Sequence, residues 1–141
     1  NSVDLNQIFN GDKLEKEIIK PTIIYSRPVL SCLEKFEVKS MAHITGGGFQ
    51  DNIIRSIPNG FQAIINTKSW DLPPVFSWIQ QEANIDSNEM LRTFNCGIGY
   101  VLIVKDGVKD SVIEHFQNAG INAYDIGFIK SGETSVIINH E

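Results

Sequence analysis

Three consecutive glycines, Gly46 to Gly48, lie between a short apolar run and a segment with helical spacing in the sequence AHITGGGFQDNIIRSIP. A glycine turn that opens a helix leaves the first backbone N–H groups of that helix free, and the helix dipole places partial positive charge beside them. Such a turn could hold a phosphate or another anion. Asn52 and Arg55 are three residues apart and would add an amide and a guanidinium on one helix face.

The same glycines also have a purely structural interpretation. Glycine allows a turn with positive φ and close packing of a helix on a sheet, and the spacing matches neither a Walker loop nor GxGxxG. The local pattern leaves both interpretations open. His43, within the apolar run MAHIT, is equally ambiguous, although a histidine in a strand is more often a hydrogen-bonded structural residue than a ligand.

A second polar cluster occupies the sequence NEMLRTFNCGIGY, where Arg92, Thr93 and Asn95 lead into a strongly apolar strand. Polar side chains at a strand entrance could face a ligand. The structural alternative is an ion pair between Glu89 and Arg92 on one short helix, worth on the order of 0.5 kcal/mol, followed by glycine turns. Taken alone, this cluster favours the structural interpretation.

Composition limits the classes of function that remain. The 141 residues are 42% hydrophobic and 21% charged, which suits one domain with a sizeable core. The net charge of −5 provides no basic stripe for nucleic acid, and no apolar run approaches the roughly 18 residues of a membrane helix. Cys32 and Cys96 are far apart and form no CxxC pair, so the sequence predicts a reducing, cytoplasmic setting without zinc or disulfides.

Known catalytic patterns are missing from the sequence. It contains no serine elbow, no HExxH, no EF-hand loop and no close pair of carboxylates within one element. We therefore predict no metal site in this chain and assign no catalytic residue. The sequence indicates a protein without a self-sufficient catalytic apparatus.

The elements that must position the two polar clusters alternate along the chain. A helix starts at Ser26 and is expected to bury Val29, Leu30, Leu33 and Phe36. Apolar periodicity predicts further helices at 49–57, 73–83, 87–94 and 108–120, and strands at 21–25, 41–45, 61–65, 99–104, 122–129 and 135–139. The last two strands flank the turn KSGE as a hairpin would. The expected fold is an α/β domain of α+β type, with a single mixed β-sheet and helices packed on it in three α/β/α layers.

The ordered segments PTIIY, AHITGGGFQDNIIRSIP, VFSWIQ, EMLRTFNCGIG and AYDIG resemble the C-terminal half of the aminoimidazole ribonucleotide synthetases, also called phosphoribosylformylglycinamidine cyclo-ligases. The resemblance covers about residues 14–132. It implies an enzyme of purine biosynthesis in which ATP phosphorylates the formyl oxygen of formylglycinamidine ribonucleotide. An amidine nitrogen then closes the imidazole ring, giving aminoimidazole ribonucleotide, ADP and phosphate.

The resemblance also implies an organisation and a set of partners. Members are cytoplasmic two-domain homodimers that use ATP and magnesium, with the active site in the cleft between the halves and most nucleotide and metal contacts on the N-terminal half. Residues 1–13 are then expected to be a linker or tail from a missing N-terminal domain, and residues 14–141 the C-terminal domain. The chain starts with Asn1, which fits a fragment. Such a fragment is expected to bind no cofactor alone and to be inactive.

Carried onto this sequence, the resemblance implies a set of phosphate- or substrate-binding residues in the two polar clusters: His43, Thr45, Gly46, Gly47, Gly48, Asn52, Arg55, Arg92, Thr93 and Asn95. Two other classes of function remain as alternatives. One is a stand-alone phosphate- or nucleotide-binding module without turnover. The other is a structural dimerisation domain, which would hold no anion at the glycine turn.

Overall fold

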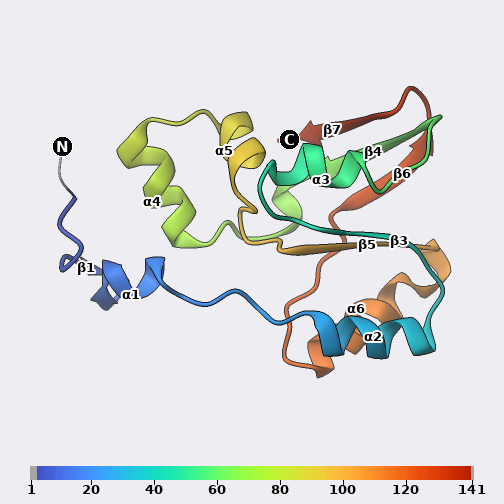
Figure 1. Cartoon of the computed structure of the whole chain (residues 1–141), viewed down its shortest axis with the longest axis horizontal. Coiled ribbons are helices and arrows are strands. Elements are labelled where there is room, and N and C mark those ends of the chain that lie inside the picture. The colour runs from blue at the N-terminus through green and yellow to red at the C-terminus, as the bar shows by residue number, and fades with distance from the viewer. Residues whose placement is uncertain (1–2, 141) are drawn as a thin grey trace.

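The computed structural model describes residues 3–140, and its core is built on two small sheets that helices cover (Figure 1). In the first sheet, β3 (Val38–His43) pairs antiparallel with β5 (Tyr100–Val104), and Ala42 lies opposite Val101. One face of this pair packs on α2 (Ser26–Lys35) and α6 (Lys109–Asn118). The buried residues of this smaller cluster are Val29, Cys32, Val112 and Phe116.

The second sheet has three strands in the order β6 (Gly127–Ser131), β4 (Phe61–Asn66) and β7 (Ser135–Asn139). The central strand β4 runs antiparallel to β6 and parallel to β7. Ala63 and Ile65 on β4 join the main core, together with residues from α3 (Gly48–Ile54) and α5 (Ser87–Thr93). This core also contains one face of the β3–β5 pair, so it connects the two sheets.

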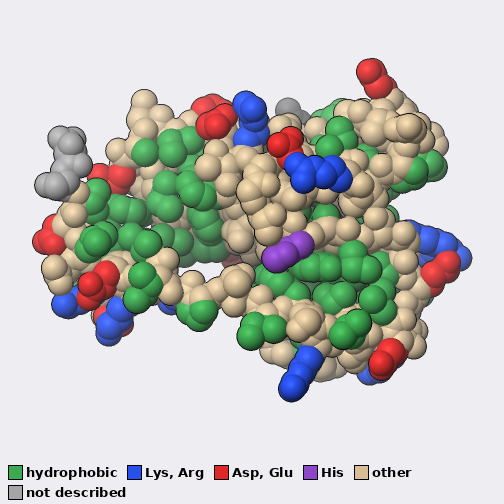
Figure 2. Space-filling model, in the orientation of Figure 1, with side chains coloured by type: hydrophobic (Ala, Val, Ile, Leu, Met, Phe, Trp, Pro, Cys, Tyr) green, Lys and Arg blue, Asp and Glu red, His purple; other side chains and the backbone are tan. Residues whose placement is uncertain are grey.

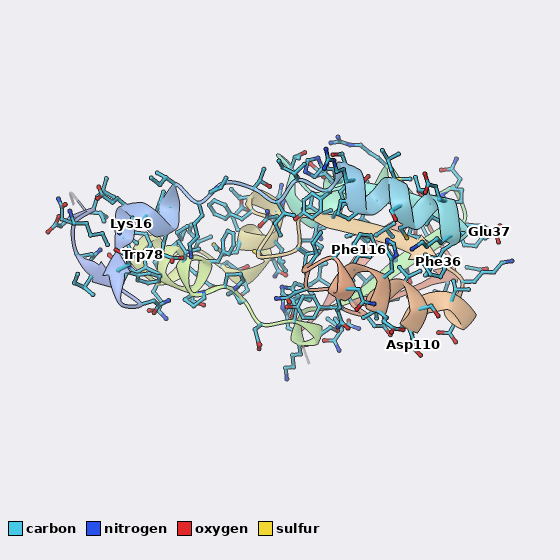
Figure 3. The ribbon with its side chains drawn as sticks, turned by 90° about the horizontal axis from the view of Figure 1, so that it is seen from below. Lys16, Phe36, Glu37, Trp78, Asp110 and Phe116 are labelled. Atoms are coloured by element: carbon cyan, nitrogen blue, oxygen red, sulfur yellow. The ribbon has the colours of Figure 1, made fainter. Side chains whose placement is uncertain are left out.

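The N-terminal residues form a separate lobe at one end of the molecule (Figures 1 and 3). It consists of the two-residue strands β1 (Ile8–Phe9) and β2 (Asp12–Lys13), the helix α1 (Leu14–Ile18) and, from much later in the chain, α4 (Pro74–Ala83). Phe9 meets Trp78 of α4 edge to face at 6.3 Å between ring centroids, and Leu14 is fully buried. Two short 3₁₀ helices, η1 (Thr67–Ser69) and η2 (Asp106–Val108), complete the elements.

The mixed α/β class expected from the sequence is observed, but the single mixed sheet is not. The described strands form three separate sheets, counting the β1–β2 hairpin. The expected hairpin between the last two strands is also wrong, because β4 lies between β6 and β7 and pairs with both. Residues 21–25, expected as a strand, belong to no ladder. These errors concern pairing partners, which depend on contacts between distant parts of the chain.

The buried face of α2 also differs from the prediction. Val29 and Cys32 face the core, whereas Leu30 is 61% exposed and Leu33 is 39% exposed. Among residues 3–140, no helix is both long enough and apolar enough to cross a membrane.

Candidate functional site

The glycine turn lies directly against the second polar cluster. Gly47 and Gly48 have φ of 92° and 57°, backbone angles that favour glycine. A Cβ added to Gly48 would lie 2.0 Å from the carbonyl oxygen of Leu91 and 2.8 Å from that of Arg92. The start of α3 therefore touches the backbone of α5, and only glycine fits. The structure thus brings together two motifs that are more than forty residues apart in the sequence.

The side-chain amide of Asn52 stabilises the glycine turn. Its Nδ2 atom donates toward the carbonyl oxygens of Thr45 at 3.3 Å, Gly46 at 3.2 Å and Gly48 at 2.7 Å. The Gly48 N–H donates to the Thr45 carbonyl at 3.0 Å. Because the side-chain amide donates to the loop itself, Asn52 is a positioning residue for the turn.

The charges around the turn are mixed. A Cβ on Gly47 would lie 3.0 Å from Oδ2 of Asp51, so this carboxylate lies beside the turn and opposes the approach of an anion. Arg55 directly follows the last residue of α3. At a rise of about 1.5 Å per residue, Arg55 lies about 10 Å from Gly48 along the helix axis. It is exposed and makes no ion pair within residues 3–140. The structure therefore does not place Arg55 at the turn.

The second cluster presents Arg92 on the surface of α5. Its Nη1 atom lies 3.3 Å from Oε2 of Glu89, and the two side chains are 65% and 54% exposed. Thr93 Oγ1 donates to Glu89 Oε1 at 3.4 Å. Ion pairs this exposed contribute little to stability, so the guanidinium can exchange Glu89 for another anionic partner at small cost.

Asn95 shapes the turn that leads into β5. Its Oδ1 atom accepts from the Gly97 N–H at 3.1 Å, and its carbonyl accepts from the Ile98 N–H at 2.9 Å. The Ile44 N–H, just before the glycine turn, donates to the Gly99 carbonyl at 2.9 Å. The two loops therefore meet at two places. Ile44 bonds to Gly99 just before the glycines, and Gly48 packs on the backbone of α5 at their end.

His43 lies on the surface within an aromatic cluster that we name by its three members, Tyr25–His43–Tyr100. The imidazole stacks on Tyr100 at 5.7 Å between centroids and 28° between planes, and meets the edge of Tyr25 at 5.9 Å. A Cβ on Gly99 would lie 2.2 Å from the Tyr25 hydroxyl oxygen, so Tyr25 rests on this glycine. Partial burial raises the pKa of Tyr25. Neither tyrosine was a candidate from the sequence, although both lie in or beside the segments that carry the resemblance.

Buried side chains hold the loop between α5 and β5 in place. Cys96 has φ of 48°, and its carbonyl accepts from Nε1 of Trp70 at 2.9 Å. Trp70 in turn stacks on Phe49 of α3 at 5.6 Å between centroids. Burial raises the pKa of the Cys96 thiol to about 11, so the thiol is neutral. Trp70 thus ties the core of α3 to the loop that holds Asn95.

The described part of the chain offers no set of donors that fits a metal ion. Within residues 3–140, no group of three histidine, cysteine, aspartate or glutamate side chains could hold one. We call the contact between the turn of residues 45–48 and residues 91–95 the junction of the two loops. The groups there that suit a ligand are the cationic Arg92 and the backbone N–H groups of the turn. Both suit a phosphate or another anion more than a cation.

Comparisons with known proteins agree with the resemblance drawn from the sequence. Residues 2–139 match the family described as AIR synthase related protein, C-terminal domain. Proteins named phosphoribosylformylglycinamidine cyclo-ligase from Caldicellulosiruptor saccharolyticus and Brevibacillus brevis are 48% and 49% identical over 89% and 92% of this chain. The chloroplastic enzyme of that name from Arabidopsis thaliana is 47% identical over 82% of the chain.

The matched segment is only part of these relatives. It spans 37% of the two bacterial proteins and 30% of the plant protein. The family model and the relatives cover almost all the described residues, including both loops of the junction. The chain belongs to the AIR synthase related protein family and corresponds to its C-terminal domain.

Proposed function

We propose that this chain is the C-terminal part of a longer, homodimeric, cytoplasmic enzyme of purine biosynthesis, an ATP-dependent cyclo-ligase. The enzyme closes the imidazole ring of formylglycinamidine ribonucleotide and releases aminoimidazole ribonucleotide, ADP and phosphate. The names of the relatives support the ligase class and the pathway. The observation that carries the proposal is the contact of Gly48 with the Leu91 and Arg92 carbonyls, which joins the two family motifs into one surface.

In this proposal, the junction of the two loops binds the anionic part of the substrate. Arg92 leaves its exposed partner Glu89 and pairs with a phosphate, for which a guanidinium is well shaped. The turn supplies the backbone N–H groups of Gly46 and Gly47, since the Gly48 N–H already donates to Thr45, and Thr93 adds a hydroxyl. Asn52 and Asn95 act by holding the two loops in place.

His43 and Arg55 have more distant places in the proposal. The stacked imidazole of His43 offers a flat, exposed surface and two polar ring atoms beside the junction. Arg55, at the far end of α3, contributes positive charge near the substrate without touching the turn. Neither residue is given a step in the chemistry.

ATP, when bound, supplies the phosphoryl group that converts the formyl oxygen into a leaving group. Chemistry of this kind depends mainly on positioning and on neutralising phosphoryl oxygens. The residues described here can orient an anionic substrate, but they do not fit magnesium, and no step is assigned to that ion within this chain. We propose that magnesium and most nucleotide contacts belong to the preceding half of the enzyme.

The experiment is an assay of the full-length protein with formylglycinamidine ribonucleotide, ATP and magnesium, following ADP and aminoimidazole ribonucleotide together. The proposal expects the two products in equal amounts and no ADP without the substrate. Binding of nucleotide or phosphate without ring closure would favour a binding module instead. Absence of both binding and turnover would favour a structural dimerisation domain.

A further inference from the structure

Residues 21–25, with the sequence PTIIY, have the composition of a β-strand but no strand beside them. Threonine, two isoleucines and a tyrosine in succession favour extended backbone. The segment crosses from the N-terminal lobe to α2 and belongs to no ladder (Figure 1). Within residues 3–140, the backbone N–H groups of Thr22 to Tyr25 make no hydrogen bond. A row of unpaired backbone groups is a template for pairing with another strand.

The side chains of this segment are unusually exposed for their type. Ile24 is 79% exposed and Ile23 is 49% exposed, and just before them Ile18 and Ile19 are 47% and 75% exposed. Figure 2 shows hydrophobic side chains gathered at the N-terminal end of the molecule. Four exposed isoleucines thus lie within seven residues, and exposed apolar surface of this kind marks interaction sites.

One side of the segment is already fixed to the body of the domain. Tyr25 rests on Gly99 and packs against Tyr100 at 5.4 Å between ring centroids. Ile23 and Tyr25 both line a cleft of about 950 Å³ that also borders β5 and α6. Thr22 and Ile24 do not line this cleft, as expected if side chains alternate along the segment. The segment is therefore anchored at Tyr25, while its backbone edge and Ile24 stay open.

The length of the relatives indicates what covers this edge. The matched segment spans 37% of the bacterial relatives and corresponds to a C-terminal domain, so most of a relative's chain precedes the matched part. In Figure 1, the N-terminus lies in the lobe from which residues 21–25 emerge. A preceding domain would thus join the chain at the lobe from which the open segment starts.

We propose that a β-strand from the preceding part of the full-length chain pairs with residues 21–25 and covers Ile24. The added strand continues from the edge anchored by Tyr25 and brings the preceding part next to the Tyr25–His43–Tyr100 cluster. This inference rests on the proposal that the chain is part of a longer enzyme, but not on the reaction that the enzyme performs.

The test is amide hydrogen exchange on the full-length protein, read at residues 22–25. Successive N–H groups of a strand point to opposite edges, so pairing along one edge protects alternate amides. We expect either Thr22 and Ile24 or Ile23 and Tyr25 to exchange at least about 100-fold more slowly than unstructured peptide. The matched variants Ile23→Pro and Ile24→Pro supply the control. The one that removes a bonded N–H should abolish the protection, and the other should keep most of it, because an edge strand tolerates proline where the N–H is unpaired.

Three further outcomes of the exchange experiment would either overturn or uphold the proposed strand pairing. Exchange of all four amides at unstructured rates in the folded full-length protein would overturn the proposal. Protection that disappears on dilution, in step with dissociation, would assign the partner strand to a second copy and also overturn it. Alternating, concentration-independent protection in a protein without cyclo-ligase activity would uphold the strand pairing while the proposed function failed.

Discussion

At Gly48, backbone angle and packing demand the same residue. Its φ of 57° favours glycine, and the Leu91 and Arg92 carbonyls occupy the space that a side chain would need. Gly46, two residues earlier, has open space around its Cα. The three glycines are therefore not equivalent, although the sequence alone presents them as one turn.

This difference predicts contrasting effects of one substitution at two positions. Gly48→Ala should lower the free energy of unfolding of the full-length protein by more than about 2 kcal/mol, because the added methyl meets backbone that cannot move aside. Gly46→Ala should change it by less than about 0.5 kcal/mol, since nothing lies within 4 Å. Urea unfolding of both variants measures this. Equal losses would show that the α3–α5 contact is not as tight as described.

The buried thiol of Cys96 predicts a pH dependence. Burial raises its pKa to about 11, whereas an unfolded thiol titrates near about 8.5. Above the unfolded value the unfolded chain loses this proton first, so the contribution of Cys96 to stability is complete below about pH 8.5 and declines toward pH 11. The stability difference between the natural protein and Cys96→Ala should narrow by on the order of 1 kcal/mol between pH 8.5 and 10. A difference that stays constant over this range would contradict a buried, neutral thiol.

Among the helices and strands, the sequence predicts the position of an element along the chain better than the strand with which it pairs. The runs FQAII, GYVLIV and SVIIN become β4, β5 and β7 because continuous apolar and β-branched residues favour strands wherever they pack. The insertion of β4 between β6 and β7 could not be predicted, since it depends on contacts between segments some seventy residues apart. Likewise, the predicted burial of Val29 is confirmed, but α6 packs so that Cys32 is buried with it, while Leu30 and Leu33, which fit a buried helical face by spacing, stay exposed.

The candidate site shows the same division. The sequence predicts which polar residues the two loops carry. It does not predict that the loops lie against each other, because this contact depends on how α3 packs on α5. The role of Asn52 also differs from the expected ligand amide, since its side chain binds the carbonyls of the turn. The carboxylate of Asp51 beside Gly47 had no counterpart in the sequence argument.

The turn between β3 and α3 predicts a weak, charge-sensitive anion site. Phosphate added to the full-length protein should shift the backbone amide resonances of residues 45–50, with affinity no better than about millimolar, because Asp51 opposes the anion. Asp51→Asn removes this charge and should tighten binding several-fold, and added salt should reduce the gain. Amides that stay unchanged at tens of millimolar phosphate in both proteins would leave the glycines with a packing role only.

The whole molecule divides into a sheet-and-helix body and an N-terminal lobe, with residues 21–25 between them (Figure 3). Both family loops lie on the body, and the open edge of residues 21–25 begins at Tyr25, which touches the same surface. In the proposed function, this surface of a domain with no metal cluster in its described residues would form one side of a phosphoryl-transfer site. The remaining side would come from the preceding half of the enzyme.

Kinetics of Arg92→Ala in the full-length protein test most directly whether the junction of the two loops binds substrate in a cyclo-ligase, as we propose. A matched control is Arg27→Ala, an exposed arginine on α2 that makes no ion pair and no side-chain hydrogen bond within residues 3–140. The account predicts that Arg92→Ala lowers kcat/KM for formylglycinamidine ribonucleotide at least about tenfold, roughly 1.4 kcal/mol, while the stability changes by less than about 1 kcal/mol and Arg27→Ala leaves kcat/KM unchanged. A natural value of kcat/KM in Arg92→Ala would make Arg92 only the partner of Glu89 and would contradict the account.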